Sequence, residues 1–391
     1  MQVTEKRVAV KLNEEHCSSC SICSALCPFE AIKRDSETGK TFLEIEKCQV
    51  CGLCYSTCPA SAIDIIYYDF DSLVRYLERA KKKYDSHTLV IMCKGSTPDF
   101  AGIEKLFGVA KFIPLSVPCV GRIPESVFLK AITMGIKRIG VLACDDNYCR
   151  FEKGSAIARR KIPALNLMLE QFGYGKEFIE LKQSSFKVKA DRDKCIRCGN
   201  CAFYCPHDAV KLVSPEAASF DLDSCQGCGL CVALCPAMAL VLENRERERI
   251  SALISRLSSE MTKPKILVFR CQGAALPALD EGFDSNIRAI DLPCAASIDP
   301  LDILEAFRND VDGILVAACP EEDCRSKSKS KRGSKEAQRA VMTFKKRLSQ
   351  TGFEDRLHFC FAAPRYPETL AEELRQFKEK IAASHLKEGK K

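Results

Sequence analysis

The stretch Cys17-Ser-Ser-Cys20-Ser-Ile-Cys23-Ser-Ala-Leu-Cys27-Pro28 is followed by a second one, Cys48-Gln-Val-Cys51-Gly-Leu-Cys54-Tyr-Ser-Thr-Cys58-Pro59. Both stretches have the spacing C-x2-C-x2-C-x3-C-P, which is typical of bacterial [4Fe–4S] ligation. The first three thiolates of a stretch can bind three corners of one cubane, whereas the fourth Cys lies too far along the chain to reach it. The sequence therefore predicts two clusters with crossed ligands.

This pattern resembles two-cluster ferredoxins, and the crossed assignment follows theirs. We expect Cys17, Cys20, Cys23 and Cys58 to bind one cluster, and Cys48, Cys51, Cys54 and Cys27 to bind the other. A zinc site needs only four ligands, and a disulfide framework needs an oxidising compartment that nothing else in the sequence indicates.

The composition predicts a multidomain protein without a membrane span. The chain has 391 residues, 25 of them Cys, and residues 1–15 have no apolar segment that would indicate a cleavable leader. We therefore expect a reducing compartment, the cytoplasm, with the thiols as ligands. The formal net charge is +7, but cluster-bound thiolates would more than offset it, so the charge indicates no nucleic-acid partner.

An internal repeat organises the whole chain. The Cys pattern returns with an offset of 178 residues from Cys17 to Cys195 and of 177 from Cys48 to Cys225. By the same crossover, we expect one cluster on Cys195, Cys198, Cys201 and Cys235, and another on Cys225, Cys228, Cys231 and Cys205.

Between the ferredoxin-like segments the sequence alternates strands and helices, which predicts a parallel α/β sheet. In the first copy we expect strands at 88–92, 111–115 and 138–143 and helices at 71–83, 124–134 and 151–172; in the second, strands at 266–269, 287–291 and 313–317 and helices at 245–259, 301–307 and 335–348. Short strands are also expected at 42–46 and 63–67, beside the first cluster loops.

Four more Cys in each copy follow these strands or open the next helix. They are Cys93, Cys119, Cys144 and Cys149 in the first copy, and Cys271, Cys294, Cys319 and Cys324 in the second. Sites in open parallel sheets form at the carboxyl ends of strands, and a helix start favours an anionic cluster. Each quartet is therefore a candidate metal site, with [2Fe–2S] and zinc both open at this point.

At these residues the chain resembles the delta subunit of methyl-viologen-reducing hydrogenase, a [2Fe–2S] protein. The likeness rests on Val117-Pro118-Cys119-Val120-Gly121-Arg122 and on Gly140-Val141-Leu142-Ala143-Cys144-x4-Cys149. The resemblance implies two [2Fe–2S] clusters and a connector between a hydrogenase, formate dehydrogenase or other dehydrogenase and the flavin subunit of a heterodisulfide-reductase-like, flavin-bifurcating complex in an anaerobe.

The chain departs from that family in two respects. The first is common to both copies, and the second distinguishes the two copies from each other. Cys93 and Cys271 are followed by Ser96 and Ala274, where the family tends to carry a C-x-x-C pair. The second copy also reads Ala295-Ala296-Ser297 in place of Val120-Gly121-Arg122, which removes a cation near the cluster or a partner. We interpret this loss as a sign that the two copies contact different partner surfaces.

The remaining candidates carry no catalytic pattern. His16, His207 and His358 belong to no carboxylate or nucleophile pattern, so we expect surface or satisfied histidines. We expect Cys360 to be a buried apolar thiol, and the basic stretch 325–339 is either a docking patch or a solvated helix start.

The sequence thus predicts α+β ferredoxin-like modules alternating with α/β parallel-sheet modules, duplicated into four domains at 1–68, 69–186, 187–244 and 245–391. The expected function is that of a non-catalytic electron-transfer subunit with four [4Fe–4S] and two [2Fe–2S] clusters in a hetero-oligomeric complex. The alternatives are an oxidoreductase whose strand-end clusters reduce a substrate directly, and a scaffold with structural zinc.

Overall fold

The chain forms two compact units. The computed structural model describes residues 7–95, 100–212, 218–243, 245–273, 284–328 and 330–388. The first unit contains Met1–Ser185, and the second contains Phe186–Leu276 with Gly282–Lys391. Ser96 and Ala274, where the C-x-x-C pairs of the family would end, lie outside the described residues.

Each unit begins with two small antiparallel strand pairs and two short helices. In the first unit β1 pairs with β4 and β2 with β3; in the second, β9 pairs with β12 and β10 with β11. The elements are β1 (Val10–Leu12), α1 (Ile22–Leu26), β2 (Ile32–Arg34), β3 (Thr41–Leu43), α2 (Leu53–Thr57), β4 (Ile63–Ile65), β9 (Val188–Ala190), α7 (Asn200–Tyr204), β10 (Val210–Lys211), β11 (Ser219–Phe220), α8 (Leu230–Ala233) and β12 (Leu240–Leu242). These four-strand parts hold the ferredoxin-type cysteines.

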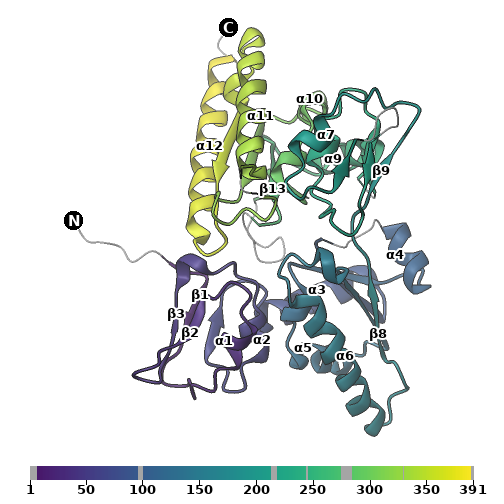
Figure 1. Cartoon of the computed structure of the whole chain (residues 1–391), viewed down its shortest axis with the longest axis vertical. Coiled ribbons are helices and arrows are strands. Elements are labelled where there is room, and N and C mark those ends of the chain that lie inside the picture. The colour runs from purple at the N-terminus through teal and green to yellow at the C-terminus, as the bar shows by residue number, and fades with distance from the viewer. Residues whose placement is uncertain are drawn as a thin grey trace. The chain divides into compact units, whose positions relative to one another are not determined.

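A four-stranded parallel sheet follows in each unit, with the order β6-β5-β7-β8 in the first and β14-β13-β15-β16 in the second (Figure 1). The strands are β5 (Thr88–Cys93), β6 (Ile113–Val117), β7 (Arg138–Ala143), β8 (Ile179–Gln183), β13 (Ile266–Cys271), β14 (Ile287–Leu292), β15 (Gly313–Ala318) and β16 (Leu357–Phe361). The order changes direction at the central strands β5 and β13, and ligands bind at such switch points in parallel sheets.

Helices and 3-10 turns connect these strands. In the first unit they are α3 (Phe70–Tyr84), α4 (Phe100–Phe107), η2 (Val120–Arg122), α5 (Glu125–Thr133), η3 (Asp146–Tyr148) and α6 (Gly154–Gln171). In the second unit they are α9 (Arg247–Ser259), η4 (Ala295–Ser297), α10 (Pro300–Arg308), α11 (Gly333–Leu348), η5 (Ser349–Thr351), η6 (Glu354–Arg356) and α12 (Pro367–Glu388).

The predicted mixture of α/β parallel sheets and small antiparallel sheets is confirmed, but two early strands end sooner than expected. Residues 45–47 form the 3-10 turn η1 (Ile45–Lys47), because the chain must bend there to present Cys48. The strand β4 ends at Ile65, and the carbonyl of Tyr67 accepts a hydrogen bond from the Arg122 side chain instead of from a neighbouring strand.

Three further elements, α4, β8 and α12, were not predicted from the sequence. Ile103 and Phe107 of α4 pack with Val90, Met92 and Leu142 of the first sheet. In the second unit α12 contacts β15 and β16, where Gly313 faces Phe377 and Ile381 closely enough that a Cβ would lie 2.8 Å from Ile381. These helices close the hydrophobic cores behind the cysteine-bearing edges.

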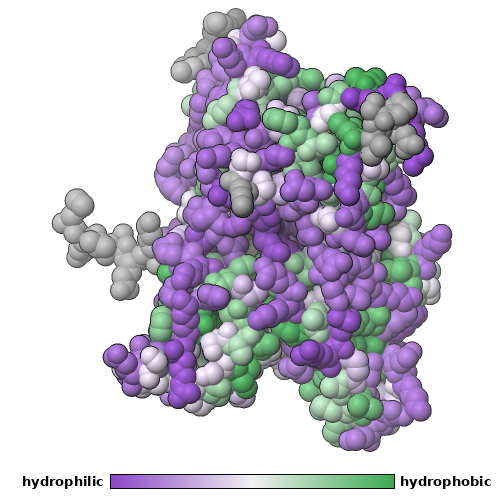
Figure 2. Space-filling view, in the orientation of Figure 1, coloured by the Kyte–Doolittle hydropathy of each residue, from purple (hydrophilic) through white to green (hydrophobic). Residues whose placement is uncertain are grey.

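No helix in the described part of the chain is long and apolar enough to cross a membrane. The face of the molecule in Figure 2 is mostly hydrophilic, with apolar side chains interspersed.

Candidate iron–sulfur centres

The cysteine loops of the four-strand parts share one backbone conformation. The residues on both sides of the middle Cys of each C-x-x-C-x-x-C loop have positive φ: Ser19 and Ser21, Val50 and Gly52, Arg197 and Gly199, and Gly227 and Gly229. A non-glycine residue such as Val50 adopts this conformation only when the surroundings require it. Repeated left-handed residues turn successive backbone N–H groups toward a common point, which is the arrangement of an anion-binding nest.

Backbone N–H groups donate to the cysteine sulfurs in both ferredoxin-type parts. Ala31 N lies 3.3 Å from Cys27 Sγ, and Ala62 N lies 3.3 Å from Cys58 Sγ. Ala239 N makes the corresponding contact with Cys235 Sγ at 3.3 Å. Hydrogen bonds to sulfur are a standard feature of cluster sites, because they help to set the reduction potential. The residues present therefore fit an iron–sulfur cluster.

The thiols gather in the crossed sets. Burial raises the pKa of the Cys23 thiol, and the neighbouring thiols of Cys58, Cys17 and Cys20 raise it further. Burial likewise raises the pKa of Cys54, followed by the thiols of Cys51, Cys48 and Cys27. In the second unit one cavity is lined by Cys195, Cys198, Cys201 and Cys235 together. The fourth Cys of each stretch thus lies beside the other stretch.

The strand-end thiols also converge, four in each unit. Hydrogen bonding to Cys93 and burial raise the pKa of the Cys119 thiol, and Cys93 also interacts with Cys144. Burial and the Cys119 thiol raise the pKa of Cys149. In the second unit Cys271 Sγ lies 3.9 Å from Cys319 Sγ. Hydrogen bonding to Cys271 and burial raise the pKa of Cys294, and the thiols of Cys228 and Cys324 raise it further.

In each unit a Gly-Ser pair at the start of a helix lies against the sulfur atoms of the quartet. The role of this pair was not predicted from the sequence. Ser155 N donates to Cys149 Sγ and Ser334 N to Cys324 Sγ, both at 3.4 Å. A Cβ on Gly154 would lie 2.2 Å from Cys119 Sγ, and one on Gly333 would lie 2.6 Å from Cys294 Sγ. The shared Gly-Ser dipeptide was a usable signal, but the second copy places it four residues further from its last Cys.

Within each unit the two kinds of site meet at a contact that we call the junction. In the unit-1 junction, Cys51 and Leu53 of the ferredoxin-type loop pack with Cys119 and Phe151 in one buried group of apolar side chains. The Ser56 hydroxyl donates to Gly121 O at 3.0 Å. In the unit-2 junction, Cys228 packs against the core that contains Cys294, and Gly229 faces Ser297.

Arg122 occupies the unit-1 junction and is 0% exposed. Its Nη1 donates to Val50 O at 3.3 Å, its Nη2 donates to Tyr67 O, and the guanidinium lies 5.3 Å from the centre of the Tyr68 ring. The prediction of a cation near the cluster thiols agrees with this position. Of the two expected places for this cation, near the cluster or near a partner, the enclosed side chain takes the one near the cluster thiols.

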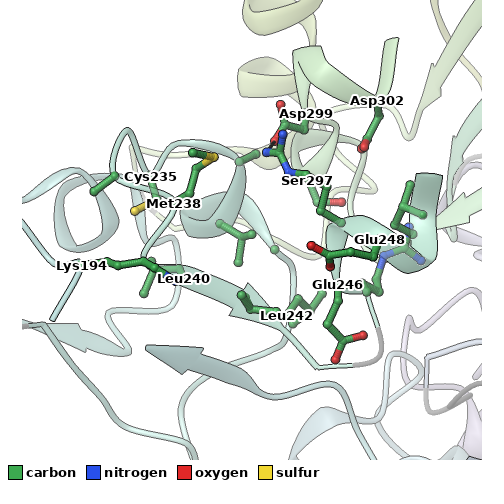
Figure 3. Close-up of a pocket in the computed structure, with 18 residues that line it drawn as sticks. Lys194, Cys235, Met238, Leu240, Leu242, Glu246, Glu248, Ser297, Asp299 and Asp302 are labelled. Atoms are coloured by element: carbon green, nitrogen blue, oxygen red, sulfur yellow. Dashed lines mark hydrogen bonds and ion pairs between the residues drawn. The ribbon is translucent and has the colours of Figure 1, made fainter. Parts of the chain in front are cut away.

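A pocket of about 420 Å³ occupies the unit-2 junction (Figure 3). Ser297, Asp299 and Asp302 line one side of it, and Cys235 and Met238 line the ferredoxin-type side. Burial and, after it, the neighbouring Asp299 raise the pKa of Asp302 to about 6.

The other candidate residues have structural surroundings. His358 was expected to be a surface or satisfied histidine, and its Nε2 lies 2.7 Å from Glu373 Oε2 on α12, so the ring is hydrogen-bonded. Burial and, after it, the nearby Arg325 lower the pKa of His207 to about 4. Cys360 is buried as expected, and burial raises its pKa to about 12.

The basic stretch 325–339 is not simply a solvated helix start. Lys331 lies inward over the Phe203 ring and donates to Cys205 O at 3.2 Å. At least part of this stretch therefore packs against the ferredoxin-type part of its own unit.

Comparison with known families agrees with these sites. The model of the methyl-viologen-reducing hydrogenase delta subunit matches residues 89–197 and again 266–384, which together are more than half of the chain. The chain belongs to this family. Models of 4Fe-4S dicluster domains match residues 9–59 and 188–242, so this family member is an iron–sulfur protein with two such domains.

Curated relatives of this family member match only in part. One subunit of the ferredoxin:CoB-CoM heterodisulfide reductase of Methanosarcina mazei is 30% identical over 275 residues, which are 64% of this chain and 32% of the relative. An iron-sulfur subunit of the F420-non-reducing hydrogenase of Archaeoglobus profundus is 28% identical over 102 residues, 25% of this chain and 72% of the relative. The chain thus spans about a third of the length of the reductase subunit.

Proposed function

We propose that the chain is an electron-transfer subunit, internally duplicated into the four domains 1–68, 69–186, 187–244 and 245–391, with four [4Fe–4S] and two [2Fe–2S] clusters. Bound clusters supply one-electron redox chemistry. The chain's own residues hold the clusters, exclude water from them and direct N–H groups at the sulfurs. No residue acts as a nucleophile in this proposal.

The observation that carries the proposal is the junction within each unit. Cys51 and Cys119 pack in the same buried hydrophobic core of the first unit, and Cys228 packs against the hydrophobic core that contains Cys294 in the second. A cluster on a ferredoxin-type loop and a cluster on a strand-end quartet would therefore be neighbours twice in the same chain. Isolated structural metal sites do not need such contacts, whereas a relay of electrons does.

The ligands in the proposal are those of the crossed assignment and the two strand-end quartets. The grouping of Cys23 with Cys58 and of Cys54 with Cys27 supports the crossover. The convergence of Cys93, Cys119, Cys144 and Cys149 supports a cluster at the first quartet.

The partners in the proposal are proteins. The relatives are named as subunits of a heterodisulfide reductase and of a hydrogenase, which supports a relay between a hydrogenase or another dehydrogenase and a heterodisulfide-reductase-like flavin subunit. Exposed apolar side chains on the second ferredoxin-type part support docking there, since Ile196, Phe203 and Met238 are 64%, 69% and 60% exposed. We place this hetero-oligomeric complex in the cytoplasm.

The test combines a metal count with a transfer assay. Anaerobically purified chain should contain about 20 iron and about 20 sulfide, by the cluster types assigned. It should then speed electron transfer between its copurifying partners while turning over no substrate alone. Stoichiometric zinc with about 16 iron would refute the [2Fe–2S] sites, and full-rate reduction of a physiological substrate by the isolated chain would refute the relay.

A further inference from the structure

The two junctions are built on corresponding positions but differ in charge. Arg122 stands where the second unit has Ser297, and Tyr68 stands where it has Arg245. Each junction thus has an arginine at one of these two corresponding positions, contributed from opposite sides of the contact. The surroundings of the two arginines are different, and this difference bears on how easily each junction accepts an electron.

Arg122 faces sulfur and carbonyl groups. Its pKa is lowered by burial and is raised by Tyr68 and by the thiols of Cys51, Cys119 and Cys54. No carboxylate of the described chain forms an ion pair with it, and its Nε has no acceptor among the described residues although it is buried. A buried cation without a counter-charge is strongly destabilising. Cluster sulfur at Cys51 or Cys119 would supply the missing negative charge and acceptor.

Arg245 faces carboxyl groups instead. Its Nη1 donates to Asp291 O at 2.9 Å, and its pKa is lowered by burial and raised by Asp302 and Asp291. Arg247 is likewise paired, at 2.9 Å, with Asp299, which Figure 3 labels at the pocket wall. Ser297 contributes only a hydroxyl, which donates to Cys294 O at 2.8 Å. Arg245 therefore has carboxyl groups nearby and Arg247 is ion-paired, whereas Arg122 has no carboxylate partner among the described residues.

We propose that Arg122 is a potential-setting residue that makes the clusters of the unit-1 junction easier to reduce than those of the unit-2 junction. Reduction adds one negative charge to a cluster, and an unneutralised cation in a low-dielectric interior stabilises that charge. When electrons equilibrate within the chain, they therefore reside preferentially in unit 1. This inference rests on the electron-transfer function proposed above.

The test is a potentiometric titration of the full-length, cluster-loaded chain, followed by electron paramagnetic resonance. Arg122→Met removes the charge and keeps much of the volume, so at least one midpoint potential should become more negative. Arg122→Lys keeps the charge and should recover most of that shift. Arg138→Met is the matched control: it removes the same charge in unit 1, but Arg138 begins β7, pairs with Glu180 at 2.7 Å and lies at the strand end away from Cys144.

The reciprocal variant is Ser297→Arg, which introduces a cation into the unit-2 pocket. It should shift a different midpoint potential in the positive direction and leave the unit-1 signals unchanged. Unaltered midpoints in Arg122→Met with full iron content would overturn the inference. If that variant does not fold, an unaltered midpoint in Ser297→Arg would overturn it. A wild-type chain without [4Fe–4S] clusters would instead refute the proposed function.

Discussion

Gly154 and Gly333 begin the helices that follow the last cysteine of each quartet, and both lie against a sulfur atom. The space beside Cys119 Sγ is too small for any side chain, since a Cβ on Gly154 would lie only 2.2 Å away. The Ser155 N–H group behind it donates to Cys149 Sγ. These glycines let the helix start approach the thiols closely.

We therefore predict that Gly154→Ala disrupts the first quartet without changing a ligand. The sulfur or the helix start must shift, at a cost of about 1–3 kcal/mol for overpacking. Iron content should fall by about two atoms per chain if the quartet holds [2Fe–2S]. Iron analysis and visible absorption would measure this, and Gly175→Ala, where no atom lies within 4 Å, is the control. A variant with unchanged iron and spectrum would contradict the prediction.

At the scale of elements, the four cysteine loops are variations of one turn. Each has left-handed residues on both sides of its middle Cys, whether these are Ser19 and Ser21 or Gly227 and Gly229. Each also has a left-handed residue three positions after its last Cys: Glu30, Ser61, Asp208 and Met238. The turn that delivers the fourth Cys to the other stretch therefore has the same shape in all four loops.

The crossover can be tested with one substitution in each stretch. Cys27→Ala should perturb the cluster bound by Cys48, Cys51 and Cys54, and leave the cluster of the first stretch nearly intact. Cys58→Ala should have the opposite effect. Resonance Raman or electron paramagnetic resonance spectra would distinguish the two clusters. Damage confined to the sequence-local cluster in both variants would show that the pairing is wrong.

Elements that a short run of residues indicates were predicted from the sequence. Elements that are recognised only by what they pack or pair with were missed. The strand β7, Arg138–Ala143, was predicted with its observed bounds, because residues 139–143 form a continuous run without a polar side chain. The edge strand β8, Ile179–Gln183, alternates in character and is recognised only by its pairing with β7. The helix α12 carries Leu370, Leu374, Phe377 and Ile381 at helical spacing, a signal that was available but not used.

The candidate sites divide in the same way. The thiols could be proposed as ligands because their spacing is visible in the sequence. The enclosure of Arg122 could not be predicted, because Val50 O and Tyr67 O are supplied by chain segments 72 and 55 residues away. The His358–Glu373 contact was missed because it depends on where α12 packs.

At the scale of the whole molecule, the two segments that match the delta-subunit model each carry a strand-end quartet, and the two quartets can be tested separately. We predict that Cys144→Ser slows electron delivery to one partner, while reduction of an artificial dye through the ferredoxin-type clusters remains largely unchanged. Cys319→Ser should affect another partner protein. Reconstituted transfer with the copurifying proteins would measure both effects. If neither Cys144→Ser nor Cys319→Ser slowed electron transfer to any partner, the proposed relay would be contradicted.

The enclosure of the junctions has a consequence for how the protein is made. Cys51 is 7% exposed and Cys119 is 1% exposed, and Ser56 and Arg122 hold the two parts of the first unit together over them. A scaffold protein that delivers iron and sulfide cannot reach these thiols once that contact has formed. We therefore expect cluster delivery to precede closure during biogenesis. Repair after oxidative loss should require the first unit to open again.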